Sequence, residues 1–379
     1  MMRVAFVSTV YGYAFSGADS LWVRAAELAV ARGDAVLIAA TPAVTAHPRL
    51  HALIQKGARG FSSQVPDIPN TTIDRFRRKL EYVSAGSESL VSALHEFCPD
   101  RVIFSCGGTY DLVREGRVLG FLRTQRIPYR VIANWQTEKP FLSPIDLGRA
   151  RACFQDADRL FFVSHRNLEI TRHHLGLPLR HAELIQVPIR IPRAGGAPWP
   201  ELSVPTFAAI GRLEPVKAFD ILLSALAKSP GTTEAWYLNI YGEGAGQGEI
   251  QHQADALGIA DRVRFRGFVS NLDEIWKDNH CLISASRDEG LPTVMIEALM
   301  YARPVIATRV GAATEWIAED ETGFTCEPES VDALSKAIDR AWKVRSRWRT
   351  MGADAHRRAV AKYLPDDALR LIEPVFAVY

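Results

Sequence analysis

Two glutamates lie eight positions apart in the stretch "SRDEGLPTVMIEAL", residues 286–299. Glu289 comes directly before a glycine, and Glu297 lies inside an apolar run. The preceding residues "HCLISAS" (280–286) have the apolar character of a buried parallel strand. Pro292 suits the first turn of a helix, because an amide there has no partner within the helix. We therefore expect Glu289 in a strand-to-helix loop and Glu297 about a turn and a half into the following helix.

This placement suits an anionic ligand that also carries hydroxyl groups. The first amides of a helix have no acceptor within it and lie at the positive end of the helix dipole. Carboxylates beside those amides accept hydrogen bonds from hydroxyl groups, and a nucleotide-diphosphate sugar needs both kinds of partner. The alternative is that Glu289 is an exposed loop acid and Glu297 a helix-surface acid.

Two cations form a second candidate group in "GRLEPVKAFD", residues 211–220. Arg212 and Lys217 lie in a loop that follows an apolar strand, where they could clamp two phosphates. The alternative is a pair of solvated surface cations. The glycine-rich "YGEGAGQGE" (241–249) carries Gln247 where a dinucleotide-binding loop requires glycine, which disfavours a dehydrogenase.

The composition indicates a globular protein with two domains. The chain has 379 residues, of which 47% are hydrophobic and 23% charged. No apolar run reaches the roughly 18 residues of a membrane span, and "MMRVAFVST" begins a strand rather than a signal peptide, so we expect a cytoplasmic protein. The five cysteines are scattered, which indicates structural thiols in a reducing compartment. No metal-binding pattern is evident, and we expect neither a metal nor a cofactor.

The charge is distributed unevenly along the chain. Residues 1–200 contain 25 basic and 17 acidic side chains, whereas residues 201–379 contain 20 and 26. Within the basic half, "TTIDRFRRKLEYV" (71–83) combines four cations with apolar residues. This segment could contact an anionic lipid surface at the inner face of the membrane or hold an acidic acceptor, or it is an ordinary solvated helix. We expect no nucleic acid partner.

Short apolar runs alternate with helical stretches along the whole chain, which predicts parallel sheets covered by helices. The expected strands of the first half are 3–9, 35–41, 101–106, 129–134, 159–164 and 183–188, and those of the second half are 206–213, 235–244, 262–268, 280–286, 304–310 and 323–328. The sequence therefore predicts an α/β protein of two doubly wound, Rossmann-like domains whose sheets face a cleft, where ligands bind at the carboxyl ends of the strands. The expected boundaries are 1–193 for the first domain, with a C-terminal helix 363–379 packed back on it, 194–204 for a linker and 205–362 for the second domain.

The second half resembles glycosyltransferase family 4, the retaining nucleotide-sugar transferases of GT-B fold. The resemblance runs through "GRLEPVKAFDILLSAL", "YGEG", "VRFRGFVSNLDEIW", "SASRDEGLPTVMIEAL" and "ARPVIATRVGAATEWIAEDETGF", over about residues 205–345. The first half resembles the family more weakly, through "SGADSLWVRAAELAVARGDAVLIAAT" and "DADRLFFVSHRNLEI". The resemblance implies a hexosyltransferase or related enzyme that acts on a nucleotide-diphosphate sugar and retains anomeric configuration.

The resemblance also implies roles for individual residues. It places Glu289 on the donor sugar, Glu297 on the nucleotide ribose, and Arg212 and Lys217 on the diphosphate. Further donor contacts are implied for Gly290, Leu291, Pro292, Gly17, Gly242 and Glu243. Many family members have glycine after the lysine, where this chain has Ala218.

The first-domain histidine that family members often place near the reacting sugar has no clear counterpart here. The loop "NWQTEKP" takes its place, so we expect acceptor-side contacts from Asn134, Gln136, Thr137 and Glu138. The acceptor is a saccharide, a lipid-linked compound or a small molecule, and the nucleotide is UDP or GDP. Two other functions stay open: a nucleotide-sugar-binding protein without transfer activity, and a GT-B epimerase of sugar nucleotides.

Overall fold

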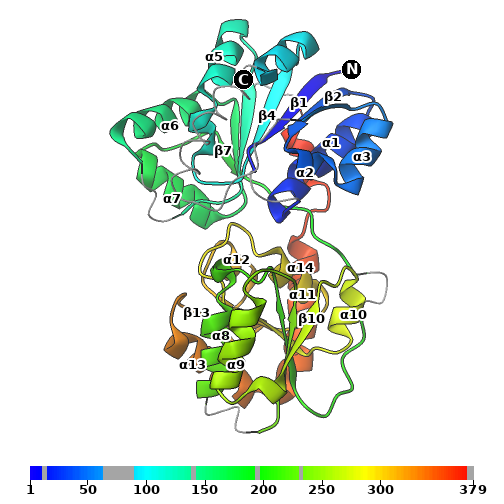
Figure 1. Ribbon diagram of the computed structural model, residues 1–379, viewed down its shortest axis with the longest axis vertical. Helices are drawn as coiled ribbons and strands as arrows, with labels where there is room; N and C mark the ends of the chain where they lie inside the picture. The colour runs from blue at the N-terminus through cyan, green and yellow to red at the C-terminus, as the bar shows by residue number, and fades with distance from the viewer. Residues whose placement is uncertain (11–14, 63–88, 138–141, 193–196, 230–233, 374–379) are drawn as a thin grey trace. The chain divides into compact units, whose positions relative to one another are not determined.

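The structure is a computed structural model that describes residues 1–10, 15–62, 89–137, 142–192, 197–229 and 234–373. Its internal contacts define two compact units (Figure 1). Unit 1 comprises Met1–Pro188 and Leu364–Tyr379, and unit 2 comprises Ile189–Tyr363. The first segment of unit 1 thus ends at Pro188, whereas the sequence predicts that the first domain ends at 193.

Unit 1 is built on a seven-stranded parallel sheet of order β3-β2-β1-β4-β5-β6-β7. Its strands are β1 (Arg3–Ser8), β2 (Ala35–Ala40), β3 (Arg59–Ser62), β4 (Arg101–Cys106), β5 (Tyr129–Ala133), β6 (Arg159–Phe162) and β7 (Ala182–Leu184). The sequence predicts all of them except β3. That edge strand has a single large apolar side chain, Phe61, and therefore lacks the apolar run by which the others were found.

Helices cover both faces of this sheet, with α5, α6 and α7 on one face and α1 on the other (Figure 1). The helices of unit 1 are α1 (Gly17–Ala31), α2 (Pro42–Thr45), α3 (Pro48–Gln55), α5 (Gly116–Gln125), α6 (Pro144–Asp156) and α7 (His165–Leu175), with a 3₁₀ helix η1 at Asp111–Arg114. The amphipathic stretch "SLWVRAAELAVARGD" (20–34) predicts a helix that begins at residue 20, but α1 begins at Gly17. Asp19 accepts a hydrogen bond from the Ser16 amide at 2.9 Å, and this capping box starts the helix earlier.

Unit 2 contains a six-stranded parallel sheet of order β10-β9-β8-β11-β12-β13. Its strands are β8 (Thr206–Ile210), β9 (Tyr237–Tyr241), β10 (Val263–Gly267), β11 (Cys281–Ser284), β12 (Val305–Thr308) and β13 (Gly323–Cys326). Each lies within a range that the sequence predicts. The two α/β units with parallel sheets confirm the expected fold class.

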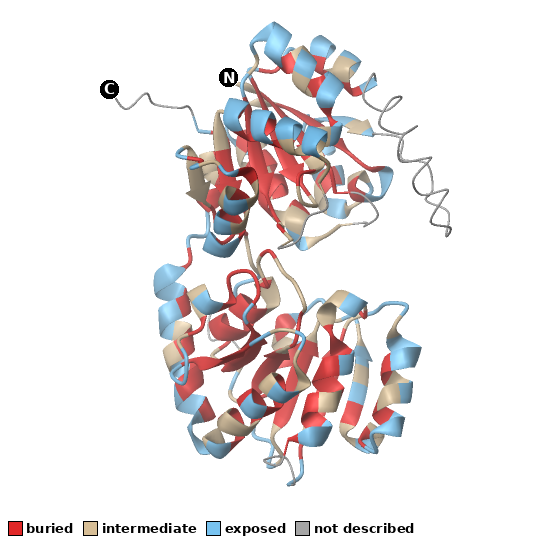
Figure 2. Cartoon of the chain, turned by 90° about the vertical axis from the view of Figure 1, so that its left-hand side faces the viewer, coloured by how far each residue is buried: buried red, intermediate tan, exposed pale blue. Residues whose placement is uncertain are grey.

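The helices of unit 2 form two layers around the sheet (Figure 1). The helices α8 (Phe219–Lys228), α9 (Gln247–Ala256) and α13 (Val331–Lys343) cover one face, and α10 (Leu272–Trp276), α11 (Thr293–Met300) and α14 (Trp348–Lys362) cover the other. Short elements complete the unit at α12 (Ala313–Trp316), η2 (Pro215–Lys217), η4 (Ala260–Arg262) and η5 (Arg345–Arg347). Figure 2 shows the result in each unit: buried strands at the centre and exposed outer helix faces.

The expected C-terminal helix 363–379 is wrong for the residues that the structure describes. The α-helix α14 ends at Lys362, and a short 3₁₀ helix, η6 (Asp367–Leu371), follows in unit 1. Arg130 fixes this segment, because its buried guanidinium donates to the carbonyls of Arg370 at 3.0 Å and Leu371 at 2.9 Å. Asp158 neutralises Arg130 at 3.0 Å.

The segment that the sequence indicates as a linker is partly packed onto unit 2. Arg303 is buried and donates to the Pro198 carbonyl at 2.6 Å and to the Asn279 carbonyl at 2.9 Å. Its guanidinium also lies 5.2 Å from the ring centroid of Trp199. Burial lowers the pKa of Arg303 to about 10, so the group stays charged at neutral pH and is satisfied by carbonyl oxygens.

Gly352 gives a test of how closely α14 packs against the turn after α11. A Cβ at this position would lie 2.0 Å from the Ala302 carbonyl oxygen, which is backbone and cannot rotate away. We expect Gly352→Ala to lower the free energy of unfolding by about 1–3 kcal/mol, the usual range for overpacking. Urea denaturation of the full chain measures the change.

Gly248→Ala is the matched control for this experiment. Gly248 lies in α9 of the same unit, and nothing lies within 4 Å of its hypothetical Cβ. Alanine there gains helix propensity and should stabilise the chain by up to ~1 kcal/mol. Equal stability of the two variants would contradict the packing described for Gly352.

His280 predicts a pH dependence of stability. Its Nδ1 accepts a hydrogen bond from the Thr206 amide at 3.1 Å, and burial, aided by the charge of Arg303, lowers its pKa. The unfolded chain therefore binds this proton more readily, so the stabilisation is complete above about pH 6.5 and is lost as the pH falls below it. Urea titrations at pH 7.5 and 5.5 should show a fall in unfolding free energy that His280→Asn reduces; an unchanged fall would assign it to other groups.

Candidate functional site

The loops that carry most of the predicted residues follow four neighbouring strands of unit 2. In the order β9-β8-β11-β12, each strand runs parallel to the next, so the loops after them lie at one edge of the sheet. The loops comprise residues 211–218, 242–246, 285–292 and 309–312. The carboxyl edge of a parallel sheet is where doubly wound proteins bind ligands.

Backbone contacts join the loops after β8 and β9. The Gly211 amide donates to the Tyr241 carbonyl at 2.9 Å, and the Leu213 amide donates to the Glu243 carbonyl at 2.9 Å. A Cβ on Gly242 would lie 1.9 Å from the Gly211 carbonyl oxygen. Gly242 therefore permits this close approach, while the exposed Glu243 contributes its carbonyl to the loop pairing. The glycine-rich stretch that fails as a dinucleotide loop thus has a structural purpose.

Lys217 and Glu289 form an ion pair that links the loops after β8 and β11. Both side chains are largely buried, and the Ser286 hydroxyl donates to the same Glu289 carboxylate oxygen at 2.9 Å. The Lys217 chain passes over Gly211, whose hypothetical Cβ would lie 3.1 Å from the lysine Cε. The structure thus brings Lys217 and Glu289 together. The family resemblance implies that Lys217 contacts the diphosphate and that Glu289 contacts the sugar.

Arg212 lies in the same loop as Lys217 but is more exposed. Its guanidinium forms an ion pair with Glu214 at 3.2 Å. The loop therefore carries both predicted cations at the carboxyl edge of β8, each beside an acid.

Arg287 belongs to the site region, and sequence reasoning missed it. Its amide donates to the Val216 carbonyl at 2.9 Å, and its guanidinium donates to Asp220 at 2.6 Å. Burial opposes ionisation of Asp220, but the hydrogen bond and charge of Arg287 outweigh it and lower the pKa of that carboxyl. Arg287 thus fixes the loop before Glu289 against the start of α8; its position two residues before Glu289 was the available signal.

The helix α11 begins one residue later than the sequence predicts. Thr293 is its first residue, and Pro292 is the N-cap rather than a member of the first turn. Gly290 and Pro292 are buried, and Leu291 is half-buried. The backbone of Gly311 packs closely against this loop. The φ of Gly311 is +50°, and a Cβ on it would lie 2.4 Å from the Gly290 carbonyl oxygen.

Glu297 lies inside α11, is buried, and forms an ion pair with Arg190. Its Oε1 accepts from the Arg190 amide at 3.2 Å and from Nε at 2.9 Å, and its Oε2 accepts from Nη2 at 2.8 Å. The bond raises the pKa of Arg190 against the opposing effect of burial. The interpretation of Glu297 as a helix-surface acid is therefore wrong, and Arg190 is a second residue that the sequence analysis did not find, because nothing in "RIPR" marks it.

The predicted acceptor-side residues lie at the carboxyl edge of unit 1. Asn134 is buried and donates to the Ser105 hydroxyl at 3.0 Å, and Gln136 is 1% exposed with no hydrogen-bond partner for its amide among the described residues. The Thr137 amide donates to the Thr109 hydroxyl at 2.8 Å. Gly17 is exposed, with open space around its hypothetical Cβ.

Glu138 and the basic segment 71–83 lie outside the described residues. Among the residues that the structure does describe, no group of three or more His, Cys, Asp and Glu side chains is placed to hold a metal ion. Within the same residues, no helix combines the length and the apolar character needed to cross a bilayer.

Comparison with known proteins finds relatives among the glycosyl transferases. Residues 201–358 match the family model of the group 1 glycosyl transferases. Structures of HepE from Anabaena with UDP and with UDP-glucose each superpose with a TM-score of 0.75 at 18% identity, covering 98% of both chains. Sucrose-phosphate synthase from Thermosynechococcus elongatus gives a TM-score of 0.74 at 19% identity over 97% of each chain. The fold and the site region thus define a two-domain protein of GT-B class.

The match to the group 1 glycosyl transferases lies in the carboxyl-terminal unit of the chain. The exopolysaccharide phosphotransferase SCO2592 of Streptomyces coelicolor is 28% identical over 66% of this chain and 26% of that protein. D-inositol 3-phosphate glycosyltransferase of Mycolicibacterium smegmatis is 32% identical over 35% of this chain and 32% of that protein. The matches therefore span less than half the length of these relatives. The resemblance to family 4 is confirmed.

Gly311 provides a test of whether the Glu289 loop must keep its position. We expect Gly311→Ala to push the Gly290 carbonyl away and to lower affinity for the nucleoside diphosphate, or turnover, at least tenfold. The substitution also carries about 1–2 kcal/mol of strain, because φ is positive. Calorimetric titration with UDP and GDP and a thermal melt measure the two effects separately.

Gly258→Ala separates backbone strain from the collision. Gly258 lies in the same unit with φ +69°, and nothing lies within 4 Å of its hypothetical Cβ. It should lose similar stability and keep full ligand affinity. Normal affinity in Gly311→Ala would show that the loop tolerates displacement.

Proposed function

We propose that this protein transfers a sugar from a nucleotide-diphosphate sugar to an acceptor, with retention of anomeric configuration. The observation that carries the proposal is the gathering of Arg212, Lys217, Glu289 and the start of α11 at one edge of the unit 2 sheet. Cations, an acid and free helix amides are the partners that a diphosphate joined to a sugar requires. Unit 2 is then the donor-binding domain.

Stabilisation of the leaving group is the chemical task of this arrangement. Cleavage of the glycosidic C–O bond leaves negative charge on the diphosphate, and Arg212, Lys217 and the first amides of α11 are the donors nearest to that position in our proposal. The Lys217–Glu289 pair gives this lysine a defined position before any ligand arrives. A donor that is already oriented contributes more to rate than one that must reorganise.

Glu289 and Glu297 have different tasks in the proposal. Glu289 contacts the hydroxyls of the donor sugar, and Glu297 contacts the ribose. A carboxylate accepts about four hydrogen bonds, so Glu297 retains capacity beside the three that Arg190 supplies. Arg190 then orients the carboxylate toward the ribose.

Among nucleotides, we favour UDP. HepE, which shares this fold, was solved with UDP and with UDP-glucose. The acceptor side would be formed by Asn134, Gln136 and Thr137 in unit 1, and Gly17 would contribute a donor contact. The buried amide of Gln136, which has no partner among the described residues, supports a polar acceptor, because a buried amide without a partner is costly unless a ligand satisfies it.

Incubation of the full chain with a panel of sugar nucleotides tests the proposal. Slow release of free sugar and nucleoside diphosphate, with retained configuration in the first-formed product by NMR, is the expected result. Interconversion of sugar nucleotides would instead indicate an epimerase, and tight binding without turnover would indicate a binding protein. Either result would overturn the proposed transfer.

Variants of the two glutamates test their separate roles. Glu297→Gln should weaken nucleotide binding and raise KM more than it lowers kcat, because a ribose contact changes little in the transition state. Glu289→Gln should lower kcat while affinity for the free nucleoside diphosphate hardly changes, because charge develops beside it. Steady-state kinetics and calorimetric titration provide both quantities.

Arg190→Ala is the control for Glu297, since it removes the ion pair but keeps the carboxylate. If Glu297 contacts the ribose, Arg190→Ala should lose less affinity than Glu297→Gln at a similar loss of stability. Equal affinities for wild type and Glu297→Gln would refute the ribose contact. Normal turnover in Glu289→Gln would make Glu289 a structural loop acid.

A further inference from the structure

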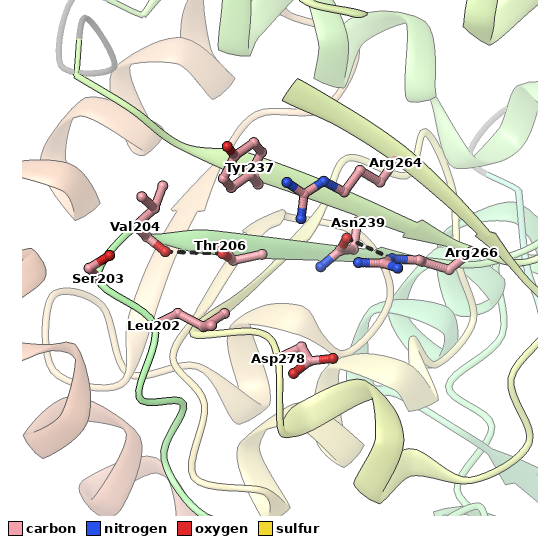
Figure 3. A pocket seen from close by; sticks show the side chains of 9 residues that line it. All are labelled: Leu202, Ser203, Val204, Thr206, Tyr237, Asn239, Arg264, Arg266 and Asp278. Atoms are coloured by element: carbon pink, nitrogen blue, oxygen red, sulfur yellow. Dashed lines mark hydrogen bonds between the residues drawn. The ribbon is translucent and has the colours of Figure 1, made fainter. Parts of the chain in front are cut away.

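A cavity of about 320 Å³ opens on unit 2 away from the loops described above (Figure 3). Its lining comes from the first residues of β8 and β9, from the edge strand β10, and from the segments before β8 and β11: Leu202, Ser203, Val204, Thr206, Tyr237, Asn239, Arg264, Arg266 and Asp278. Ligand pockets range from about 300 to 1,000 Å³, so this cavity fits a small molecule rather than a sugar nucleotide.

Two arginines of β10 supply its positive charge. Arg264 lies over the ring of Tyr237 at 3.8 Å, and Arg266 donates through Nε to the Asn239 side chain at 2.9 Å (Figure 3). Arg264 and Arg266 alternate along β10 and are both exposed. Neither guanidinium forms an ion pair with a described residue. The remaining N–H groups of Arg264 and Arg266 are therefore free of acidic partners within the described part of the chain.

The position of Arg266 is set by a buried chain of amides. Asn239 is 1% exposed and donates to Asn279 at 2.9 Å, and Asn279 donates to the Tyr241 hydroxyl at 2.8 Å. A buried network that is satisfied in this way holds its members rigidly. Arg266 is thus oriented before a ligand binds, which lowers the entropic cost of holding an anion.

The other walls of the cavity differ in character. Asp278 contributes a carboxylate that forms no ion pair with a described residue, and Figure 3 shows it apart from both arginines. Leu202, Val204 and the ring of Tyr237 contribute apolar surface. A ligand that matches this lining carries an anionic group for the two arginines and hydroxyls that donate to Asp278. It also carries an apolar C–H face for the apolar residues.

The cavity lies toward the amino-terminal ends of β8 and β9, although Arg266 comes near the carboxyl end of the edge strand β10. Thr206 is the first residue of β8, whereas Arg212 and Lys217 follow its last residue, Ile210. A five-residue strand spans roughly 16 Å at about 3.3 Å per residue. The two sites therefore share a sheet but not a ligand.

We propose that this cavity binds a small phosphorylated sugar. Guanidinium groups match phosphate oxygens in geometry and charge, and Asp278 and Ser203 offer partners for sugar hydroxyls. The apolar wall fits the C–H face of a pyranose ring. The proposal does not rest on the transfer reaction proposed above.

Calorimetric titration of the full chain with glucose 6-phosphate, inorganic phosphate and glucose tests the site. We expect glucose 6-phosphate to bind at least tenfold more tightly than the other two. Arg264→Ala should weaken that binding about tenfold to a hundredfold, as loss of a hydrogen bond to a charged group does. Arg264→Ala leaves the hydrogen-bonded chain of Asn239, Asn279 and Tyr241 intact, so the fold of this variant should be unchanged. Arg266→Lys keeps the positive charge and should still weaken binding.

Two controls locate the bound ligand. Arg349→Ala removes an exposed arginine elsewhere on unit 2 and should leave binding unchanged. The double variant Arg212→Ala with Lys217→Ala should also keep it, because those residues belong to the donor loops. Absence of binding, equal affinity for inorganic phosphate, or loss of binding in the donor-loop variant would each overturn the proposal, leaving Arg264 and Arg266 as charges that protect an exposed edge strand.

Discussion

The ion pair between Lys217 and Glu289 is the contact on which the site region depends. It joins the loops after two neighbouring strands, β8 and β11, and both partners are largely removed from solvent. A partly buried pair of this kind is costly to break from one side, because the remaining charge is left without a partner. The Ser286 hydroxyl and the Arg287 contacts stabilise the same loop. The two loops therefore act as one rigid surface rather than as two flexible segments.

Backbone proximity makes that surface possible. Gly242 and Gly311 lie where any side chain would collide with the backbone of a neighbouring loop. Ala218 lies at a position that also favours glycine, but for a different reason. Its φ is +50°, which falls in the left-handed region of backbone conformation. The glycine that many family members carry at this position would suit this turn, so the departure at Ala218 leaves the local conformation unchanged and does not argue against the family's site geometry.

The sequence predicts the strands well because buried parallel strands carry continuous apolar runs, and it misses β3 because an edge strand with a single large apolar residue does not. It also places Arg212, Lys217 and Glu289 in loops that follow recognisable strands, where the structure has them. It does not find Arg190, whose partner Glu297 is 107 positions away in sequence. Contacts of that separation follow from tertiary packing, on which local periodicity carries no information. The Pro292 N-cap and the start of α1 at Gly17 differ from expectation by a few residues, because the apolar pattern of a sequence does not fix the exact end of a helix.

The attachment of Arg190 to Glu297 has a thermodynamic consequence. Arg190 is the second residue of unit 2 along the chain, directly after the crossing from Pro188 to Ile189. If Glu297 contacts the ribose as we propose, a ligand that draws on its lone pairs changes the free energy with which this crossing segment is held to α11. Linkage is reciprocal, so whatever tightens or loosens the crossing segment must change the affinity for that ligand by the same factor. Under this proposal, the segment that connects the two units is coupled to the occupancy of a single carboxylate.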